Sequence, residues 1–331
     1  MRRIEKVLVI LVFAICHLRL CAICYAAFED VTAGARAAGM GNAFVGMADD
    51  VSALFYNPAG ISRMSCGELG ACYVQLHPGL TYDNSLADGI IMYAQPLKGD
   101  LGALGAGYTE RRISDLYGER TGIITYGREF KRTQPFSIGV SLKYRYKYYK
   151  AEYDTTNPSQ LDPVFQNGTS AQGISIDIGG LYRFTDDISL GVFLGDVNQP
   201  DISLKGSDPV PFNFKCGLSS RLGAKKDYTL NADCSYRDGD FKLGLGVENW
   251  LQVRASEVEL DGMWARTDTI GWRAGFGFGT NNYKAVSAGA SYRFGGSDLQ
   301  VDYAFVYPLG SIKNTWGTHC VSLTMRFKAG E

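Results

Sequence analysis

The sequence predicts an all-β protein, a transmembrane antiparallel up-and-down β-barrel of about fourteen strands with an N-terminal segment that contains a short helix. Three observations support this fold class. Most of the chain alternates apolar and polar residues with a period of two, which is the period of a strand and not of a helix. Most of these runs have the length that suits tilted membrane strands. Short and long connections alternate between them, as in transmembrane barrels.

The first 26 residues have the pattern of a secretory signal peptide. Basic residues precede an apolar run over residues 7–15, and small residues lead to Ala26. The run is too short to span a bilayer as a helix, so the pattern predicts cleavage after Ala26 and export of the chain. Cys21 and Cys24 leave a lipoprotein signal as an alternative, although the residues before Cys21 form a poor lipidation box.

The strand prediction rests on residue alternation. In one run Phe136, Ile138 and Val140 alternate with Ser137 and Gly139, so that one face is apolar and the other polar. The predicted strands cover residues 67–77, 87–97, 101–110, 121–131, 135–152, 171–185, 187–198, 211–223, 226–237, 240–252, 268–280, 284–294, 297–307 and 315–328. A closed barrel follows, because it is the only sheet that pairs every backbone polar group within a bilayer.

The connections between these strands predict the orientation. If both termini lie in the periplasm, the connections after even-numbered strands should be short. Tight turns are predicted at 98–100, 132–134, 186, 224–225 and 295–296, and long polar loops at 78–86, 111–120, 153–170, 199–210 and 308–314. There are exceptions: the connection at 253–267 is too long for a periplasmic turn, and those at 238–239 and 281–283 are short for outer loops. The chain therefore divides into a signal peptide (1–26), an N-terminal hatch (27–65) and a barrel (66–331).

Charged residues fall in the polar phase of the predicted strands. A Lys or Arg on the lipid face near the midplane costs about 2–4 kcal/mol, so these residues should face the lumen or lie near the rims. The candidate lumen-lining charges are Lys143, Arg145, Asp177, Arg183, Lys215, Arg221, Asp233, Arg293, Asp302 and Arg326. They could form a charged conduit or ligand site, or simply pair with one another across a polar lumen. Tyrosines in the outward phase, such as Tyr144 and Tyr303, fit interfacial girdles.

The segment before the first strand is rich in glycine and alanine, which let backbone pass close to other backbone. Asp49 or Asp50 could cap a short helix through Tyr56, and Pro58 and Gly60 would end it. A nucleotide loop would need a strand before the glycines and a Lys at a fixed offset, and neither is present. We therefore expect a hatch folded into the periplasmic mouth of the barrel, with a simple periplasmic extension as the alternative. The hatch motif comprises Gly34, Arg36, Gly39, Gly41, Asn42, Asp49, Asp50, Asn57, Pro58 and Gly60.

The composition offers few residues for catalysis, metal binding or nucleic-acid binding. The formal charge of −1 gives no general attraction to nucleic acid. His77 and His319 are the only histidines outside the signal segment, and no Ser/His/Asp arrangement accompanies them, so an outer-membrane lipase or protease is disfavoured. The five cysteines after residue 26 form neither a disulfide framework nor a zinc pattern. We predict no enzyme activity, no metal and no cofactor.

Several stretches resemble a known family. Residues 34–45 followed by 48–60 closely resemble the N-terminal signature of the PorV/PorQ family, part of the larger group of FadL-like outer-membrane barrels. Residues 301–305 and 317–327 are similar to its closing hairpin. The resemblance implies a fourteen-stranded barrel in the outer membrane of a Gram-negative-type bacterium. It also implies that the N-terminal segment plugs the lumen and that the Asn-Pro-Ala turn joins hatch to first strand.

Two functions follow from the resemblance. PorV-like members partner a large secretion translocon of the type IX system and hand exported proteins to the attachment machinery, which implies a non-enzymatic export accessory. The FadL-like relation implies, as the alternative, passive uptake of hydrophobic small molecules. Uptake predicts a continuous apolar pocket in the lumen, whereas a lumen packed with paired charges would count against it.

Overall fold

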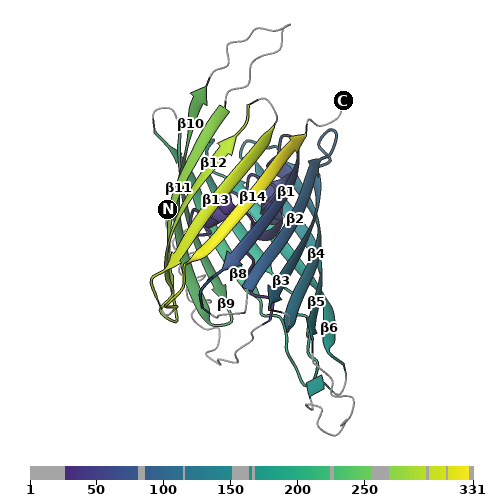
Figure 1. The fold of residues 1–331 in the computed structure, drawn as a ribbon. Coiled ribbons are helices and arrows are strands. Elements are labelled where there is room, and N and C mark those ends of the chain that lie inside the picture. The colour runs from purple at the N-terminus through teal and green to yellow at the C-terminus, as the bar shows by residue number, and fades with distance from the viewer. Residues whose placement is uncertain are drawn as a thin grey trace, which may run out of the picture.

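A computed structural model describes residues 27–80, 86–114, 116–150, 164–165, 168–223, 227–254, 268–295, 298–310 and 312–327, and the predicted signal peptide lies outside these ranges. Within them the chain forms one closed antiparallel barrel of fourteen strands, in which each strand pairs with its sequence neighbours and β1 pairs with β14 (Figure 1). The predicted fold class is therefore confirmed. None of the helices in the described residues is long and apolar enough to cross a bilayer.

The strands agree closely with the predicted ranges. They are β1 Gly67–Leu76, β2 Leu86–Pro96, β3 Ala103–Ile113, β4 Tyr117–Phe130, β5 Phe136–Tyr149, β6 Ser170–Arg183, β7 Ile188–Gly195, β8 Asn213–Leu222, β9 Tyr228–Arg237, β10 Asp240–Arg254, β11 Asp268–Gly279, β12 Lys284–Arg293, β13 Leu299–Pro308 and β14 Thr318–Phe327. One connection was predicted wrongly. The long loop expected at 111–120 is instead strand on both sides, because the β3–β4 pairing continues to Ile113 and Tyr117.

The two ends of the barrel differ. Gly67 pairs with Phe327, so β1 begins and β14 ends at one rim, which we call the terminal rim. The described connections there are short, and the connection at 255–267, which is also at this rim, lies outside the described residues. The opposite rim, the loop rim, carries the connections at 77–85, 150–169 and 196–212. Since outer-membrane barrels have short periplasmic turns and long extracellular loops, the loop rim is the extracellular one.

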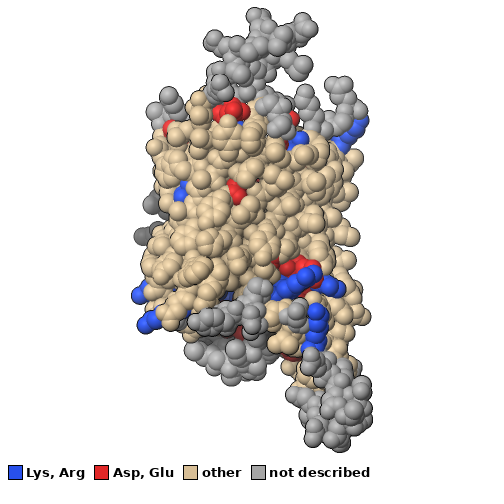
Figure 2. All heavy atoms as spheres, in the orientation of Figure 1, with Lys and Arg blue, Asp and Glu red and all other residues tan. Residues whose placement is uncertain are grey.

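Side chains alternate between the two faces of the wall. In β5, Leu142 is 52% exposed on the outside while the neighbouring Lys143 is 7% exposed in the lumen. Large apolar side chains cover the outer face of the strands, and on the face drawn in Figure 2 charged side chains gather toward the ends of the wall. An apolar outer band with a polar interior is the arrangement that a bilayer requires.

The segment before β1 lies inside the barrel, where its purple helices are visible in Figure 1. It contains α2 (Ala35–Ala38), α3 (Ala53–Tyr56) and the 3₁₀ helix η1 (Pro58–Arg63). Phe28 contacts Arg145 near the loop rim, and η1 contacts the parts of β4, β5 and β6 nearer the terminal rim. The segment therefore passes along the lumen before it enters β1.

Two local expectations for this segment need correction. The N-cap of α3 is Ser52 and not an aspartate, although Asp50 accepts a hydrogen bond from the Ser52 backbone N–H (2.9 Å). The predicted helix does end at Tyr56, but Pro58 and Gly60 do not end the helical stretch. They lie in η1, which begins at Pro58 and which the Asn57 side chain caps by accepting from Ala59 N (3.2 Å). Proline fits this position because it has no N–H to leave unpaired in a first helical turn.

Candidate functional site

The centre of the candidate site is Arg36 of α2, which joins the two halves of the hatch motif to the barrel wall. Its Nη1 lies 2.6 Å from Asp49 Oδ1 and 2.9 Å from Asp50 Oδ2. On its other side Nη2 and Nε donate to the two carboxylate oxygens of Glu248 at 2.7 and 2.8 Å. This fork-to-fork geometry is the strongest form of Arg–carboxylate pairing. Arg36 therefore links the Gly-Ala-Arg stretch, the Asp-Asp stretch and β10.

The ion-pair network continues from Glu248 to the neighbouring strands of the barrel wall. Arg273 on β11 is the direct cross-strand partner of Glu248, and its Nε donates to Glu248 Oε2 at 2.7 Å. Its Nη1 donates to Ser291 and lies 3.6 Å from Asp302 Oδ1. Because Glu248 and Arg273 are almost fully buried, each charge depends on its partners for the polar contacts that water would otherwise provide.

Other wall side chains hold the backbone of the hatch. Asp233 of β9 accepts from the backbone N–H groups of Phe44 and Val45, both at 2.6 Å. Glu68 of β1 accepts from Val51 N at 3.0 Å. In the opposite direction, the Asn57 amide donates to the backbone oxygen of Gly180 (3.0 Å) and to Val45 O within the hatch (3.1 Å). Apart from the bond to Gly180, which lies in β6, these bonds satisfy buried backbone groups of the hatch, which has no strand or long helix to pair with.

Inward-facing glycines let the hatch approach the wall backbone. A Cβ at Gly191 would lie 2.1 Å from Val45 O, and one at Gly275 would lie 2.2 Å from Gly41 N. A Cβ on Gly139 would similarly lie 2.3 Å from Ala59 N. The hatch therefore packs backbone against backbone, with no space for a side chain between them.

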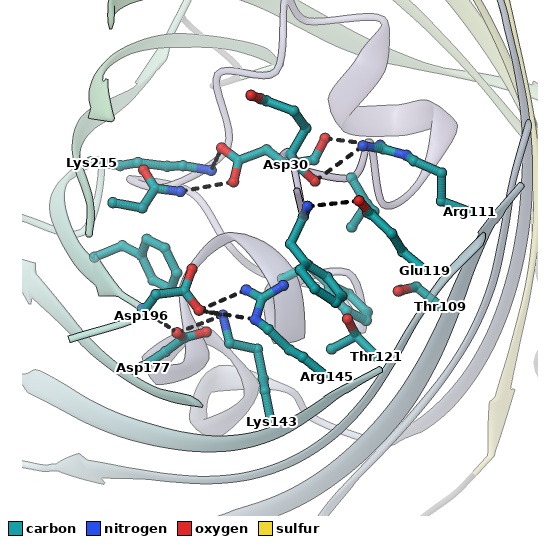
Figure 3. Close-up of a pocket in the computed structure, with 16 residues that line it drawn as sticks. Asp30, Thr109, Arg111, Glu119, Thr121, Lys143, Arg145, Asp177, Asp196 and Lys215 are labelled. Atoms are coloured by element: carbon teal, nitrogen blue, oxygen red, sulfur yellow. Dashed lines mark hydrogen bonds and ion pairs between the residues drawn. The ribbon is translucent and has the colours of Figure 1, made fainter. Parts of the chain in front are cut away.

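A second charged cluster lies toward the loop rim (Figure 3). Lys143 Nζ lies 2.7 Å from Asp177 Oδ1 and 2.9 Å from Asp196 Oδ1, and Arg145 Nη2 lies 2.6 Å from the same Asp196 oxygen. Across the cavity Asp30 of the hatch pairs with Lys215 (2.6 Å). The cluster therefore joins β5, β6 and β8 with the first residues of the hatch.

Asp30 also pairs with Arg237 Nη1 at 3.0 Å. Burial raises the pKa of the Asp30 carboxyl, but the positive charges of Lys215 and Arg237 outweigh it and hold that pKa well below its usual range. Asp30 therefore stays ionised. The positive charges of Lys215 on β8 and Arg237 on β9 hold the start of the hatch.

The loop between β7 and β8 covers this end of the lumen. Ile202 and Val210 pack with Phe28 in a small buried apolar cluster. The Asp201 carboxylate accepts from the backbone N–H groups of Ser203 and Asp208, both at 3.0 Å, which fixes the loop. These contacts give the loop a defined conformation over the start of the hatch.

Two small cavities lie in the part of the lumen that the structure describes. A cavity of about 50 Å³ lies among Phe28, Asp30 and the Lys143 cluster, and one of about 160 Å³ lies between the hatch and strands β8 to β10. Ligand pockets for small molecules usually measure about 300–1,000 Å³. These cavities have room for a few waters.

The other predicted lumen charges lie nearer the terminal rim. Arg326 Nε donates to Glu68 Oε1 at 2.9 Å. Arg293 Nε donates to Gln300 Oε1 at 3.0 Å. Arg183 reaches Glu129 at 3.4 Å, and Arg221 is exposed and donates to the Asp186 backbone oxygen at 3.1 Å. Arg183 and Arg221 therefore do not join the central network.

Sequence reasoning did not single out Glu248, Arg273 or Asp196. Glu248 and Arg273 occupy the same inward phase as the residues that were selected. Arg273 lies between Gly271 and Gly275, and Glu248 follows Gly246 by two positions. A charged residue in a glycine-rich inward row is the signal that could have found them. Asp196 lies just after β7, and in the predicted strand 187–198 it shared the apolar phase of Val192 and Leu194, so the alternation did not mark it as inward.

The described residues contain no group of three or more His, Cys, Asp or Glu side chains that could hold a metal ion. Within the same ranges His77 and His319 lie apart from the charged networks, and His319 Nδ1 pairs with the Tyr303 hydroxyl on the outer face.

The fold and the filled lumen define a class of protein, a plugged outer-membrane β-barrel. The sequence profile of the family described as type IX secretion system membrane protein PorP/SprF matches residues 53–325, and the chain belongs to that family. No curated protein sequence matches the chain. The protein is thus a secretion-associated membrane protein of the outer membrane of a Gram-negative bacterium. The finer PorV/PorQ resemblance is not confirmed by this match.

Solved structures with the same fold include FadL-like channels. The Ralstonia pickettii toluene transporter TbuX has a TM-score of 0.59 at 14% identity, covering 89% of this chain and 98% of that one. The CymD monoaromatic hydrocarbon channel has a TM-score of 0.59 at 14% identity (91% and 99%), and a Pseudomonas aeruginosa FadL homologue has 0.54 at 14% (88% and 98%). At this identity the likeness is one of fold. Family and fold are those of secretion or channel-type membrane proteins rather than enzymes.

Proposed function

We propose that the protein is a non-enzymatic accessory in type IX protein export and surface attachment. It would act as a closed barrel that presents its loop rim to a large secretion translocon and to exported proteins. Family membership supports a place in this secretion system. The role in handing exported proteins to the attachment machinery is the finer part of the proposal, and it rests on the PorV/PorQ-like hatch motif of Arg36 and its partners.

The observation that carries the proposal is the filled, charged lumen. A hydrophobic compound that crossed it would have to pass the buried pairs Arg36–Glu248 and Lys143–Asp177. Separating such a pair, or exposing it to an apolar ligand, leaves each charge without its partner. The loss of a partner costs several kcal/mol per charge. The cavities of about 50 and 160 Å³ are also small for a ligand. The described lumen therefore favours docking at the surface over passage.

The first experiment is purification of the native protein from outer membranes in a mild detergent, after cross-linking. We expect a much larger barrel protein and exported proteins to co-purify. Purification of the barrel alone, from cells that are actively secreting, would contradict the proposal. A variant that lacks the described part of the β7–β8 loop should lose the partner while the barrel keeps its heat-modifiable gel mobility.

Hydrophobic uptake is the alternative, and it is supported by the fold shared with the toluene transporter and the hydrocarbon channel. Saturable binding of a fluorescent hydrophobic probe to the purified barrel, displaced by toluene, would favour uptake over export. Planar bilayers give an independent measure. We expect the intact barrel to be silent and a variant without residues 34–60 to conduct, and a silent deletion variant would contradict the role of the hatch.

A further inference from the structure

A groove of about 410 Å³ lies on the outside of the barrel at the loop rim. It is lined by residues of the β3–β4 and β5–β6 ends, among them Arg112, Arg120, Tyr146, Tyr148 and Lys150. In this size range grooves hold small-molecule ligands or headgroups. Neither the lumen network nor the proposed export function uses this groove, so the inference below does not rest on that function.

The floor of the groove is aromatic. The rings of Tyr146 and Tyr148 are stacked, with centroids 6.0 Å apart, and the Arg120 guanidinium lies 4.9 Å from the Tyr148 ring centroid. Tyr148 lies flat across β4 because its cross-strand partner is Gly118, where a Cβ would lie 2.5 Å from the ring. The glycine therefore creates the floor, and the cation–π contact holds one arginine above it.

The walls of the groove are basic. Arg112 and Arg120 have exposed side-chain fractions of 62% and 43%, and both pair with the single carboxylate of Glu110, at 2.9 and 3.0 Å. Two guanidinium groups that share one carboxylate keep donors for a further anion, and Lys150 adds a third positive charge to the lining. Arginines in this arrangement suit the bidentate recognition of phosphate.

Strand register places the groove at a defined depth. The outward residues Tyr108, Tyr144 and Ile174 are exposed and lie in one row across β3 to β6. The next outward row toward the loop rim contains Glu110, Arg120, Tyr146 and Gln172. The outer face of the wall thus changes from apolar to charged between these two neighbouring rows, with tyrosines at the boundary. Aromatic girdles of this kind mark the level of lipid headgroups.

We propose that the groove binds the phosphate of a phosphorylated glycolipid of the outer leaflet. The phosphate lies between Arg112 and Arg120, and the acyl chains continue down the wall over the row of Tyr108, Tyr144 and Ile174. Charge complementarity selects the anion, and the adjoining apolar row selects an amphiphile over a soluble polymer. In Figure 2 Lys and Arg, with Asp or Glu beside them, gather at the lower right of the wall, at the loop-rim end.

Native mass spectrometry of the purified full-length barrel tests the proposal. The probes are monophosphorylated lipid A, the same glycolipid without its phosphate, and inorganic phosphate. We expect binding of the first at least about tenfold tighter than of the second, since a charge-assisted hydrogen bond contributes about 1.5–3 kcal/mol. Equal binding of the dephosphorylated glycolipid would overturn the proposal. Inorganic phosphate that binds as tightly as the lipid would assign the site to the free anion and would also overturn it.

Three variants sharpen the test. The double variant R112Q/R120Q should bind the phosphorylated lipid at least about tenfold more weakly. The variant E110Q should bind it several-fold more tightly, because the carboxylate that competes for both arginines is gone. R128Q is the matched control, since Arg128 is exposed on the same strand toward the terminal rim and lies over Phe130. Heat-modifiable gel mobility verifies folding of each variant, and weaker binding by R128Q or by E110Q would contradict the assignment.

Discussion

Arg36 of the hatch forms a two-pronged ion pair with Glu248 of β10, across 212 positions of sequence, with Nη2–Oε1 and Nε–Oε2 distances of 2.7 and 2.8 Å. The same guanidinium contacts Asp49 and Asp50. A glycine-rich motif that resembles a nucleotide loop is therefore built around one arginine that connects the hatch to the wall. Four predictions follow from this arrangement and its neighbours.

Replacing Arg36 by glutamine should loosen the hatch. The substitution leaves the almost fully buried Glu248 with Arg273 as its remaining ionic partner. Removing one member of a buried pair costs about 3–5 kcal/mol, so the free energy of unfolding in urea should fall by this order and the barrel should conduct in planar bilayers. The matched control is R63Q, because Arg63 Nε and Nη2 have no hydrogen-bond partner among the described residues. An R36Q barrel as stable and silent as the control would contradict this role.

Two adjacent glycines of β6 should respond differently to substitution by alanine. A Cβ at Gly179 would lie 2.2 Å from Asn57 Oδ1 and 2.7 Å from Pro58, whereas a Cβ at Gly180 meets nothing within 4 Å. Because overpacking costs about 1–3 kcal/mol, G179A should lower the unfolding free energy by this amount or displace the hatch. G180A should leave stability and conductance unchanged. Equal effects of the two substitutions would show that the hatch does not lie against this strand.

Oxidation should join the first strand to the last. Cys72 of β1 and Cys320 of β14 are both buried, and their Sγ atoms lie 3.4 Å apart across the seam of the barrel. Treatment with a copper–phenanthroline oxidant should give a disulfide between them, identified as a linked peptide pair by mass spectrometry. Cys216 and Cys234, with Sγ atoms 3.0 Å apart on β8 and β9, are the internal reference. A link from Cys72 to a different cysteine would refute the β1–β14 register, and C320S should abolish the product.

The ion pairs of Asp30, at the start of the hatch, should resist mild acid. The pKa of Asp30 lies below its usual range because of Lys215 and Arg237. A carboxyl with a lowered pKa stabilises the folded state above the pKa of the unfolded chain, about 3.9, and this contribution is lost as the pH falls through the lower folded value. We expect the difference in unfolding free energy between the intact barrel and its D30N variant to stay constant from neutral pH to about pH 4 and to shrink only below it. A difference that disappears between pH 5 and 7 would contradict the role of Lys215 and Arg237 as partners of Asp30.

The strands were predictable because their signal is local. Alternation along β5 specifies which face each residue takes, whatever the rest of the chain does. The turns at the terminal rim followed from the same pattern. The loop expected at 111–120 was wrong because its polar residues read as a connection, whereas Arg112 and Arg120 belong to strands that extend beyond the apolar belt. Polarity alone does not separate a loop from a strand that leaves the membrane.

The hatch was predictable as a compact glycine-rich segment with one short helix, because α3 ends at Tyr56 as expected, but α2 and η1 were not predicted. α2 went unrecognised, and η1 begins at the proline that was expected to end a helix. Helices of four to six residues have little intrinsic signal, because so short a stretch cannot form without tertiary contacts. The lumen around the segment decides its conformation.

The sequence by itself determined an exported, strand-rich chain with an apolar outer face, a polar inner face and a glycine-rich front segment. Tertiary structure decided which charges meet: Arg36 with Glu248, Asp30 with Lys215 and Lys143 with Asp177. The reason is that the direction of a side chain follows from the two-residue period of its own strand. Its partner depends on how the closed wall brings distant strands to the same depth around the hatch, and no local pattern records that.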